Sequence, residues 1–387
     1  MKPRRVLISA GEASGDLYAA SLAARLKRAW PEADFYGCTG PRMRQEGVRT
    51  VVDAASLAVV GLVEVVAHIP RIYGEYRNLI AAVRAERPDL AILTDSPDFH
   101  LRLAARLKEM GIPVIYLVAP QVWAWRKGRL GTMRRVIDQL LCIFPFEEEF
   151  FRTNGIRATY IGHPLSALAR TSLSRTEFFK KHRLPADRPL LVVLPGSRRG
   201  EAARHLDTLL EAVNRLYQIQ AASFLLPASV TTGAAFFRER IGRAPIQVIE
   251  GETWDAIGHA DLALAASGTV TIEAALLGTP MVTFYQVSPV SWVLGRRLVK
   301  VPFLSMVNLV AGRKIVPELM QREFTAERLT QEASRILGDQ SARERMKAEL
   351  AEVAERLSIG TDPMDRALSA IETVLERFGK KEEAIHV

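Results

Sequence analysis

Short runs of apolar, β-branched residues alternate with longer amphipathic segments along nearly the whole chain. Apolar runs bounded by polar turns predict buried strands, and the segments between them predict helices on both faces of a parallel sheet. The predicted strands of the first half are 5–9, 33–38, 48–53, 89–95, 113–118, 139–144 and 157–161. Those of the second half are 190–194, 222–227, 245–249, 261–266 and 280–285, and the last predicted helix beside them covers 289–299.

The same alternation in both halves predicts an α/β protein with two Rossmann-like, doubly wound parallel-sheet domains facing each other across a cleft. We expect an N-terminal domain over 1–165 and a C-terminal domain over 189–340. The polar, basic segment 166–188 is expected to connect them, and 341–387 is expected to form a helical tail. Ligands of such sheets bind beyond the carboxyl ends of the strands, so chemistry is expected there.

The charge balance narrows the class of partner. Among 387 residues there are 52 Lys and Arg against 43 Asp and Glu, a net charge of +9. This excess suits nucleic acid, an acidic membrane or a phosphorylated substrate. No apolar run approaches the ~18 residues of a membrane span, so any membrane contact is expected to be peripheral.

Metal and disulfide chemistry is not indicated by the sequence. Cys38 and Cys142 lie far apart and form no CxxC pair, which fits a reducing cytoplasm. No HExxH motif and no cluster of His and Cys occurs, so we expect neither a metal nor a cofactor.

Two turns that follow predicted first strands are candidate ligand-binding loops. Residues 9–16, SAGEASGD, carry Glu12 and Asp16 where a phosphate would otherwise lie. This turn either binds sugar hydroxyls or is structural, with Asp16 capping the helix. Residues 194–201 carry Ser197 and Arg198 at a helix start, where arginine would neutralise a leaving diphosphate; the alternative is a solvated basic helix end.

The segment 266–273, ASGTVTIE, gives the sharpest local signal. Ser267 is expected to cap the following helix, and Gly268 and Thr269 leave its first N–H groups open to an anion. Glu273 lies one turn beyond Thr269 on the same helical face and would accept hydrogen bonds from ribose hydroxyls. The segment therefore predicts nucleotide binding, although an ordinary capped helix with an exposed glutamate would look the same.

Two aspartates follow the apolar strand at 89–95. Asp95 closes that strand at its carboxyl end, where a partly desolvated acid would take a proton from an acceptor hydroxyl. Asp98 follows Pro97 in the first turn of the next helix, where the helix dipole alone explains an acid. Asp95 is the preferred base, and Asp98 remains the alternative.

A basic segment with two tryptophans is a candidate membrane or lipid surface. Trp123 and Trp125 stand beside the basic residues Arg126, Lys127 and Arg129. The combination suits a membrane interface or a phosphorylated lipid, although paired tryptophans also serve as core anchors. The apolar segment 59–69 is either a buried helix or an exposed surface for acyl chains.

Seven motifs together resemble the lipid-A-disaccharide synthase family. They are GEASGD at 11–16, GLVEV at 61–65, SPDF at 96–99, QVWAWR at 121–126, GHP at 162–164, LPGSR at 194–198 and ASGT…E at 266–273. The match continues through Asn308-Leu309 and PEL at 317–319. Two positions depart from the family pattern, Ala119 where serine is frequent and His100 where asparagine is common.

The resemblance implies a metal-independent, inverting glycosyltransferase of GT-B architecture. Such an enzyme joins UDP-2,3-diacylglucosamine to 2,3-diacylglucosamine 1-phosphate (lipid X) and releases UDP and a β-1,6 disaccharide. By motif, Asp95 is the essential acid, Arg198, Glu273 and Asn308 serve catalysis or UDP binding, and Glu12 belongs to the first signature. A homodimer, peripheral on the cytoplasmic side of the inner membrane of a Gram-negative bacterium, is also implied.

Several other functions compete with this interpretation. A UDP-hexosamine 2-epimerase would share the fold, and the peptidoglycan glycosyltransferase would require a GGTGGH-like first turn instead of GEASGD. A non-catalytic protein binding RNA or anionic lipid would share the basic charge, but no RNA-binding motif occurs and we expect no nucleic-acid partner. The missing GxGxxG motif disfavours a dinucleotide dehydrogenase.

Overall fold

The computed structural model describes residues 2–57, 62–288, 292 and 301–385. Their contacts form two compact units, Met1–Pro164 with Leu357–Val387 and, second, Leu165–Arg356. The predicted helix at 289–299 lies outside the described residues except at residue 292. Residues 59–61 of the apolar segment 59–69 also lie outside them, and the remainder forms the start of a helix.

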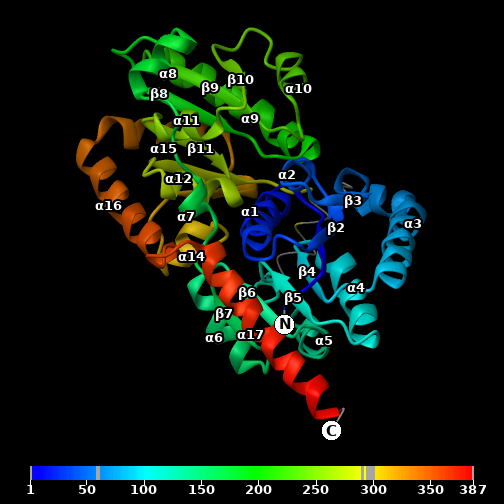
Figure 1. Cartoon of the computed structure of the whole chain (residues 1–387). Coiled ribbons are helices and arrows are strands. Elements are labelled where there is room, and N and C mark those ends of the chain that lie inside the picture. Colours follow the sequence, from blue (N-terminus) through cyan, green and yellow to red (C-terminus); the bar gives the residue numbers. More distant parts are fainter. Residues whose placement is uncertain (1, 58–61, 289–291, 293–300, 386–387) are drawn as a thin grey trace. The chain divides into compact units, whose positions relative to one another are not determined.

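Unit 1 is built on a sheet of seven parallel strands in the order β3-β2-β1-β4-β5-β6-β7. Its strands are β1 (Arg5–Ala10), β2 (Asp34–Thr39), β3 (Arg49–Asp53), β4 (Leu90–Thr94), β5 (Val114–Leu117), β6 (Gln139–Cys142) and β7 (Ala158–Tyr160). Its α-helices are α1 (Ala13–Ala29), α2 (Pro41–Gln45), α3 (Leu62–Glu86), α4 (Pro97–Glu109), α5 (Leu130–Val136), α6 (Pro145–Thr153) and α17 (Pro363–Ile385). Every residue of β4, β5 and β6 is buried, because helices cover both faces of the sheet (Figure 1).

Unit 2 repeats the arrangement with six parallel strands in the order β10-β9-β8-β11-β12-β13. The strands are β8 (Leu190–Leu194), β9 (Ser223–Ala228), β10 (Gln247–Glu250), β11 (Leu262–Ala266), β12 (Met281–Tyr285) and β13 (Glu318–Met320). The α-helices are α7 (Leu165–Leu168), α8 (Arg175–His182), α9 (Arg199–Ile219), α10 (Ala234–Arg238), α11 (Thr253–Gly258), α12 (Thr269–Leu276), α14 (Met306–Ala311), α15 (Ala326–Gly338) and α16 (Gln340–Leu357). All twelve predicted strands are present, and the three-residue β13 is an addition.

The segment between the predicted domains is folded onto unit 2. It contains α8, whose N-terminus is capped by Ser174 with Glu177 in reciprocal hydrogen bonds. The preceding residues are fixed by Asp255 of α11, which accepts hydrogen bonds from the Ser172 and Leu173 backbone N–H groups at 2.8 Å each. Residues 166–188 are thus a structured part of unit 2 in addition to joining the units.

The C-terminal helices belong to different units. Helix α16 ends unit 2, whereas α17 packs on α1 and β6 of unit 1. Arg25 of α1 forms ion pairs with Asp362 and, at 3.5 Å, with Asp365 at the start of α17. The His163 N–H also donates to the Leu357 carbonyl at 2.8 Å. This bond joins the segment that leaves unit 1 at residue 164 to the segment that returns to it at residue 357. The helical tail predicted over 341–387 is therefore divided between the two units.

The strand orders place a topological switch in each sheet. In unit 1, β1 lies between β2 and β4, and in unit 2, β8 lies between β9 and β11. In parallel sheets of this kind, ligands bind beyond the carboxyl ends of the strands at such a switch point. The predicted ligand-binding turns occupy these places. In the described part of the chain, no helix is both long and apolar enough to cross a membrane.

Candidate active site

In unit 1 the turn after β4 is bonded directly to the turn after β1. Asp95 and Ser96 both have left-handed backbones, with φ of 56° and 38°. This conformation is rare for residues other than glycine and is typical of functional turns. It directs the Asp95 carboxylate back onto the start of α1, where Oδ1 accepts from the Gly11 N–H at 2.9 Å and Oδ2 from the Glu12 N–H at 3.0 Å.

The two glycines of GEASGD are required by this approach. A Cβ added to Gly15 would lie 1.7 Å from Asp95 Oδ2 and 2.7 Å from its Cγ. A Cβ on Gly11 would lie 2.3 Å from Ser96 Oγ. Both glycines are therefore explained by the close packing of the 95–96 turn, and not by the approach of a phosphate.

A buried network fixes the main chain of Asp95 from the other side. Its carbonyl accepts hydrogen bonds from the Tyr116 hydroxyl and, at 2.9 Å, from His100 Nδ1. Since a carbonyl only accepts, Nδ1 carries the proton, and Nε2 accepts from the Ser9 hydroxyl at 2.8 Å. Burial lowers the pKa of His100 to about 4, so the ring stays neutral while it holds this turn.

The electrostatic surroundings separate the two candidate bases. Burial raises the pKa of Asp95 to about 7, and the nearby charge of Glu12 adds to this effect. Asp98 is exposed and paired with Arg126 and Arg129. Burial raises the pKa of Asp98, but the two guanidinium groups outweigh this effect and hold the pKa below its ordinary value. Asp95 therefore has the properties of a general base near neutral pH, and Asp98 does not.

Asp16 has a structural role that the sequence did not identify. Its side chain is buried and accepts from the backbone N–H groups of Gly40, Arg42 and Met43 at 2.9 to 3.1 Å. These groups belong to the first turn of α2, so Asp16 caps that helix and not its own. A Cβ on Gly40 would lie 2.4 Å from the Asp16 carboxylate, which explains this further glycine.

In unit 2 the turn after β8 presents Ser197 and Arg198 to solvent. Gly196 has a φ of 122°, which favours glycine, and the Ser197 carbonyl accepts from the Ser229 and Thr232 hydroxyls at 3.0 and 2.8 Å. Behind the turn, the buried His205 bonds the Pro195 carbonyl through Nδ1 at 2.8 Å and accepts from the Gln286 N–H at Nε2 at 3.0 Å. Arg198 thus projects from a fixed turn at the carboxyl end of β8.

The turn after the neighbouring strand β11 leads into α12. Its N-cap is Gly268, without a side-chain cap, and a Cβ there would meet nothing within 4 Å. The expectation that Ser267 caps the helix is wrong, because its hydroxyl donates to the Leu304 carbonyl at 2.9 Å. Thr269 is exposed and Glu273 is only partly accessible. Burial raises the pKa of Glu273 to about 7, against the effect of a hydrogen bond from Trp254.

Asn308 is fully buried and its amide is satisfied inside unit 2. Oδ1 accepts from the Ile315 and Val316 N–H groups at 2.8 and 3.0 Å. Nδ2 donates to the Val316 carbonyl at 3.0 Å and to Glu318 Oε1 at 2.8 Å. Direct contact with a donor, as predicted for Asn308, does not fit this geometry, and a positioning role does.

Glu318 extends this positioning network to the α12 turn, and the sequence did not single it out. Its carboxylate also accepts from the Leu304 and Ser305 N–H groups at 3.2 and 3.0 Å. The Leu304 carbonyl in turn accepts from Ser267. The only signal in the sequence was the PEL motif at 317–319, which gave no hint of partners at 304–308.

The basic segment after β5 divides into a buried and an exposed part. Trp123 is half-buried, donates to the fully buried Glu147 at 3.0 Å and stacks edge-on with Phe146. These contacts fit the core anchor that the sequence left open for Trp123, and its contact with acceptor or membrane remains a prediction. Trp125 is 40% exposed, with the Arg126 guanidinium 4.3 Å above its ring.

The cations of this segment are not all available. Lys127 is exposed, whereas Arg126 and Arg129 share the carboxylate of Asp98. In the described ranges, no group of three or more His, Cys, Asp or Glu residues is arranged to hold a metal ion.

Comparison with known proteins decides the family. A family model described as Lipid-A-disaccharide synthetase matches residues 6–371. The lipid-A-disaccharide synthase of Solibacter usitatus (strain Ellin6076) is 65% identical over 96% of this chain and 98% of its own. That of Koribacter versatilis (strain Ellin345) is 42% identical over 98% of this chain and 100% of its own.

The chain belongs to the lipid-A-disaccharide synthase family. It is therefore a glycosyltransferase, and the predicted GT-B fold is confirmed. A UDP-GlcNAc 2-epimerase from Neisseria meningitidis bound to UDP-GlcNAc superposes with a TM-score of 0.62 at 11% identity, covering 96% of this chain and 100% of the other. The glycosyltransferase of kitacinnamycin gives 0.64 at 16% identity, covering 96% and 99%. At these identities the structural similarity shows a shared fold only.

Proposed function

We propose that this chain transfers a diacylglucosamine unit from UDP-2,3-diacylglucosamine to the 6-hydroxyl of 2,3-diacylglucosamine 1-phosphate, with Asp95 as the base. Membership in the lipid-A-disaccharide synthase family supports the reaction. The observation that carries the assignment of the base is the Asp95 carboxylate, held at the β1–β4 switch point with a pKa of about 7.

Asp95 takes the proton of the acceptor hydroxyl as its oxygen attacks C1 of the donor sugar. The C1–O bond to the diphosphate breaks from the opposite face, and UDP leaves with the bonding electron pair, which inverts the anomeric centre. The two backbone N–H bonds orient the carboxylate while its pKa remains near the pH at which it must accept and later release a proton.

The donor half of the reaction is assigned to unit 2. Arg198 and the open N-terminus of α12 at Gly268 and Thr269 offer positive charge and N–H groups to the diphosphate. Glu273, one turn further along α12, accepts hydrogen bonds from the ribose hydroxyls. Ser197 fixes the turn that carries Arg198, and Asn308 supports the α12 turn through Glu318.

The test of the function is UDP release with and without lipid X. We expect UDP release only when the acceptor is present, and a disaccharide product in equal amount. Asp95→Asn should slow transfer by roughly 10²–10⁴-fold, the usual contribution of a positioned base, without a change in UDP affinity. Asp98→Asn, the matched control, should retain most of the activity. UDP release independent of lipid X, or a disaccharide made at the normal rate by Asp95→Asn, would contradict the proposal.

We also propose a peripheral membrane contact on unit 1. Trp125 and Lys127 are exposed on the basic segment. Ile69 and Tyr73 are 53% and 60% exposed one turn apart on α3, where they form an apolar face. A substrate whose acyl chains stay in the bilayer requires such a surface, and a basic residue near an anionic membrane contributes about 1 kcal/mol.

Vesicle flotation tests the membrane contact. Trp125→Ser with Lys127→Ser should reduce binding to anionic vesicles about tenfold, while Tyr217→Ser with Lys180→Ser on unit 2 should not. Arg126 and Arg129 are left unchanged because they pair with Asp98. Equal flotation of the two variants would remove this surface from the proposal. The homodimer remains a prediction from the resemblance, which sedimentation velocity tests.

A further inference from the structure

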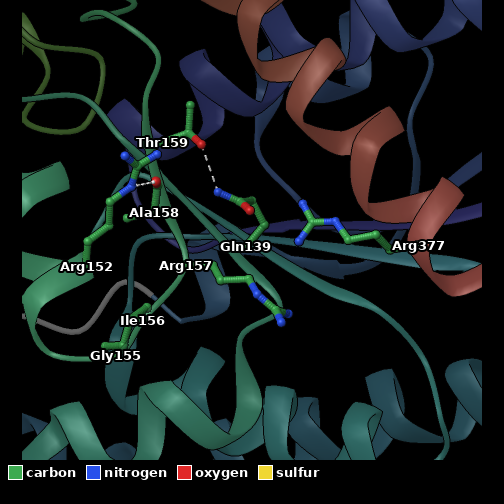
Figure 2. A pocket seen from close by; sticks show the side chains of 8 residues that line it. All are labelled: Gln139, Arg152, Gly155, Ile156, Arg157, Ala158, Thr159 and Arg377. Carbon is green, nitrogen blue, oxygen red and sulfur yellow. Dashed lines mark hydrogen bonds between the residues drawn. The ribbon is translucent and has the colours of Figure 1, made fainter.

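Unit 1 contains a hollow at the edge of the sheet opposite to the turn that carries Asp95. Gln139 begins β6 and Ala158 begins β7, so the hollow opens at the amino ends of these strands. Asp95 follows the carboxyl end of β4 in the same parallel sheet. The hollow has a volume of about 500 Å³ and is lined by Gln139, Arg152, Gly155, Ile156, Arg157, Ala158, Thr159 and Arg377 (Figure 2).

The lining is strongly cationic. Three of its residues are arginines and none is acidic. Figure 2 shows Arg377 extending from α17 toward Gln139, with Arg152 approaching from the other side. Arg134 adds a further cation beside the hollow, since its Cδ lies 3.2 Å from the position of a Cβ on Gly155. Like charges gathered in this way favour the binding of an anion.

The arginines differ in how far the protein already uses them. Arg152 donates to the Ala158 carbonyl at 2.9 Å and pairs with Glu148 at 2.7 Å. Among the described residues, Arg377 makes one hydrogen bond, from Nε to the Thr373 carbonyl of its own helix at 3.1 Å. The Arg157 guanidinium makes no hydrogen bond or ion pair within the described residues. Within the described part of the chain, the whole Arg157 guanidinium and the two terminal nitrogens of Arg377 thus remain available to a ligand.

Gln139 supplies a hydrogen-bond acceptor beside these donors. Its Nε2 donates to Thr159 Oγ1 at 2.9 Å, which fixes the orientation of the amide. Its Oε1 accepts no hydrogen bond from any described residue. The lining therefore combines donors that suit phosphate oxygens with one acceptor that suits a hydroxyl.

We propose that this Arg157–Arg377 pocket binds a phosphate ester that also carries a hydroxyl group, independently of the active site. Planar guanidinium groups bind phosphate oxygens in bidentate fashion, and Gln139 Oε1 accepts from the hydroxyl. The volume is in the range of small-molecule sites. Two sources share this chemistry, the glycerol phosphate headgroup of an anionic phospholipid and a soluble sugar or glycerol phosphate.

The test compares two double variants of equal charge change. Arg157→Ser with Arg377→Ser removes the free guanidinium groups. Arg28→Ser with Arg84→Ser removes two exposed arginines at the ends of α1 and α3, and serves as the control. The probes are glycerol 1-phosphate, titrated by calorimetry in saturating UDP so that the donor site is filled, and vesicles of phosphatidylglycerol against phosphatidylcholine. Thermal unfolding of both variants monitors the fold.

Each guanidinium lost should weaken the binding of at least one probe about tenfold. The pocket variant should therefore bind that probe about 100-fold more weakly than the control variant. If the pocket variant loses glycerol 1-phosphate binding, a soluble phosphate ester is a sufficient ligand for the pocket. Loss confined to phosphatidylglycerol vesicles identifies the lipid headgroup. The proposal is overturned if the two variants bind both probes equally, or if the unaltered protein binds neither.

Discussion

Gly15→Ala is the sharpest perturbation of the proposed base, because it moves the Asp95 carboxylate without removing any polar group of the site. Gly15 lies in the first turns of α1, where alanine is the better helix former by about 1 kcal/mol. The new methyl would nevertheless occupy the position of the Asp95 carboxylate, 1.7 Å from Oδ2 and 2.7 Å from Cγ. Since α1 is packed against the sheet, the Asp95 side chain has to turn away.

The magnitude follows from the contacts that are lost. Turning Asp95 breaks its hydrogen bonds to the Gly11 and Glu12 N–H groups. Each partly solvated bond contributes about 1 to 1.5 kcal/mol, so the loss of two outweighs the gain in helix propensity. We expect unfolding free energy to fall by about 1–2 kcal/mol and transfer to slow by roughly 100-fold or more, because a displaced base no longer reaches the acceptor.

The assay is disaccharide formation under saturating donor and acceptor, with denaturant unfolding measured in parallel. Gly74→Ala is the matched control, because Gly74 lies inside α3 and a Cβ there meets nothing within 4 Å. It should gain stability and keep full activity. If Gly15→Ala turned over as fast as Gly74→Ala, either the Asp95 carboxylate would not lie against α1 or it would not be the base.

The remaining predictions concern pH and the groups that support the site. With Asp95 as the ionised base, kcat should fall about tenfold per pH unit below its pKa of about 7. An Asp98 base, whose pKa is lowered, would show no such fall near neutral pH, and a profile of that kind excludes Asp95. UDP affinity should increase as pH rises from 6 to 8, because ribose hydroxyls donate more strongly to the ionised Glu273 carboxylate than to the protonated one. In Glu273→Gln, calorimetry should show only the pH dependence that comes from the titration of UDP itself. The same pH dependence in both proteins would refute the contact. His100→Phe, which removes the bonds to Ser9 and to the Asp95 carbonyl, should lower kcat with little change in UDP affinity, while His100→Asn should lower it less; equal activity of all three would mean that the ring only fills space.

The sheets were predictable because strands that are buried on both faces consist of continuous runs of apolar residues. Strands β8 and β11 are apolar throughout and β4 is apolar up to its last residue, Thr94, and each strand is followed at once by a turn. The position of Asp95 followed from the same rule, since a carboxylate that ends a buried strand has little structural reason to be there. The left-handed backbone at Asp95 and Ser96 had no such pattern in the sequence, because neither residue favours it.

Partners distant in sequence account for most of what was missed. Asp16 caps α2, Trp123 bonds Glu147 and Ser267 bonds the Leu304 carbonyl, and no local pattern distinguishes these residues from ligand-binding ones. Motif resemblance has the same limit, since it marks a position as important without saying why. Asn308 matched the family pattern, yet its buried amide supports Glu318 and the loop at 315–316.

The two units use one topological position for opposite electrostatic purposes. At the β1–β4 switch, burial and the charge of Glu12 both raise the pKa of Asp95, and the effects that lower it are hydrogen bonds from Gly11, Glu12 and Ser96, none of them a cation. A cation beside this carboxylate would lower its pKa and weaken it as a base. At the β8–β11 switch, Arg198 and an uncapped helix N-terminus favour negative charge, which is what a departing diphosphate develops. In the proposed mechanism the two sheets divide the roles, so each keeps the local charge that its own step requires. This division would account for the acids in the first turn of the sequence and the arginines in the corresponding turn of its second half.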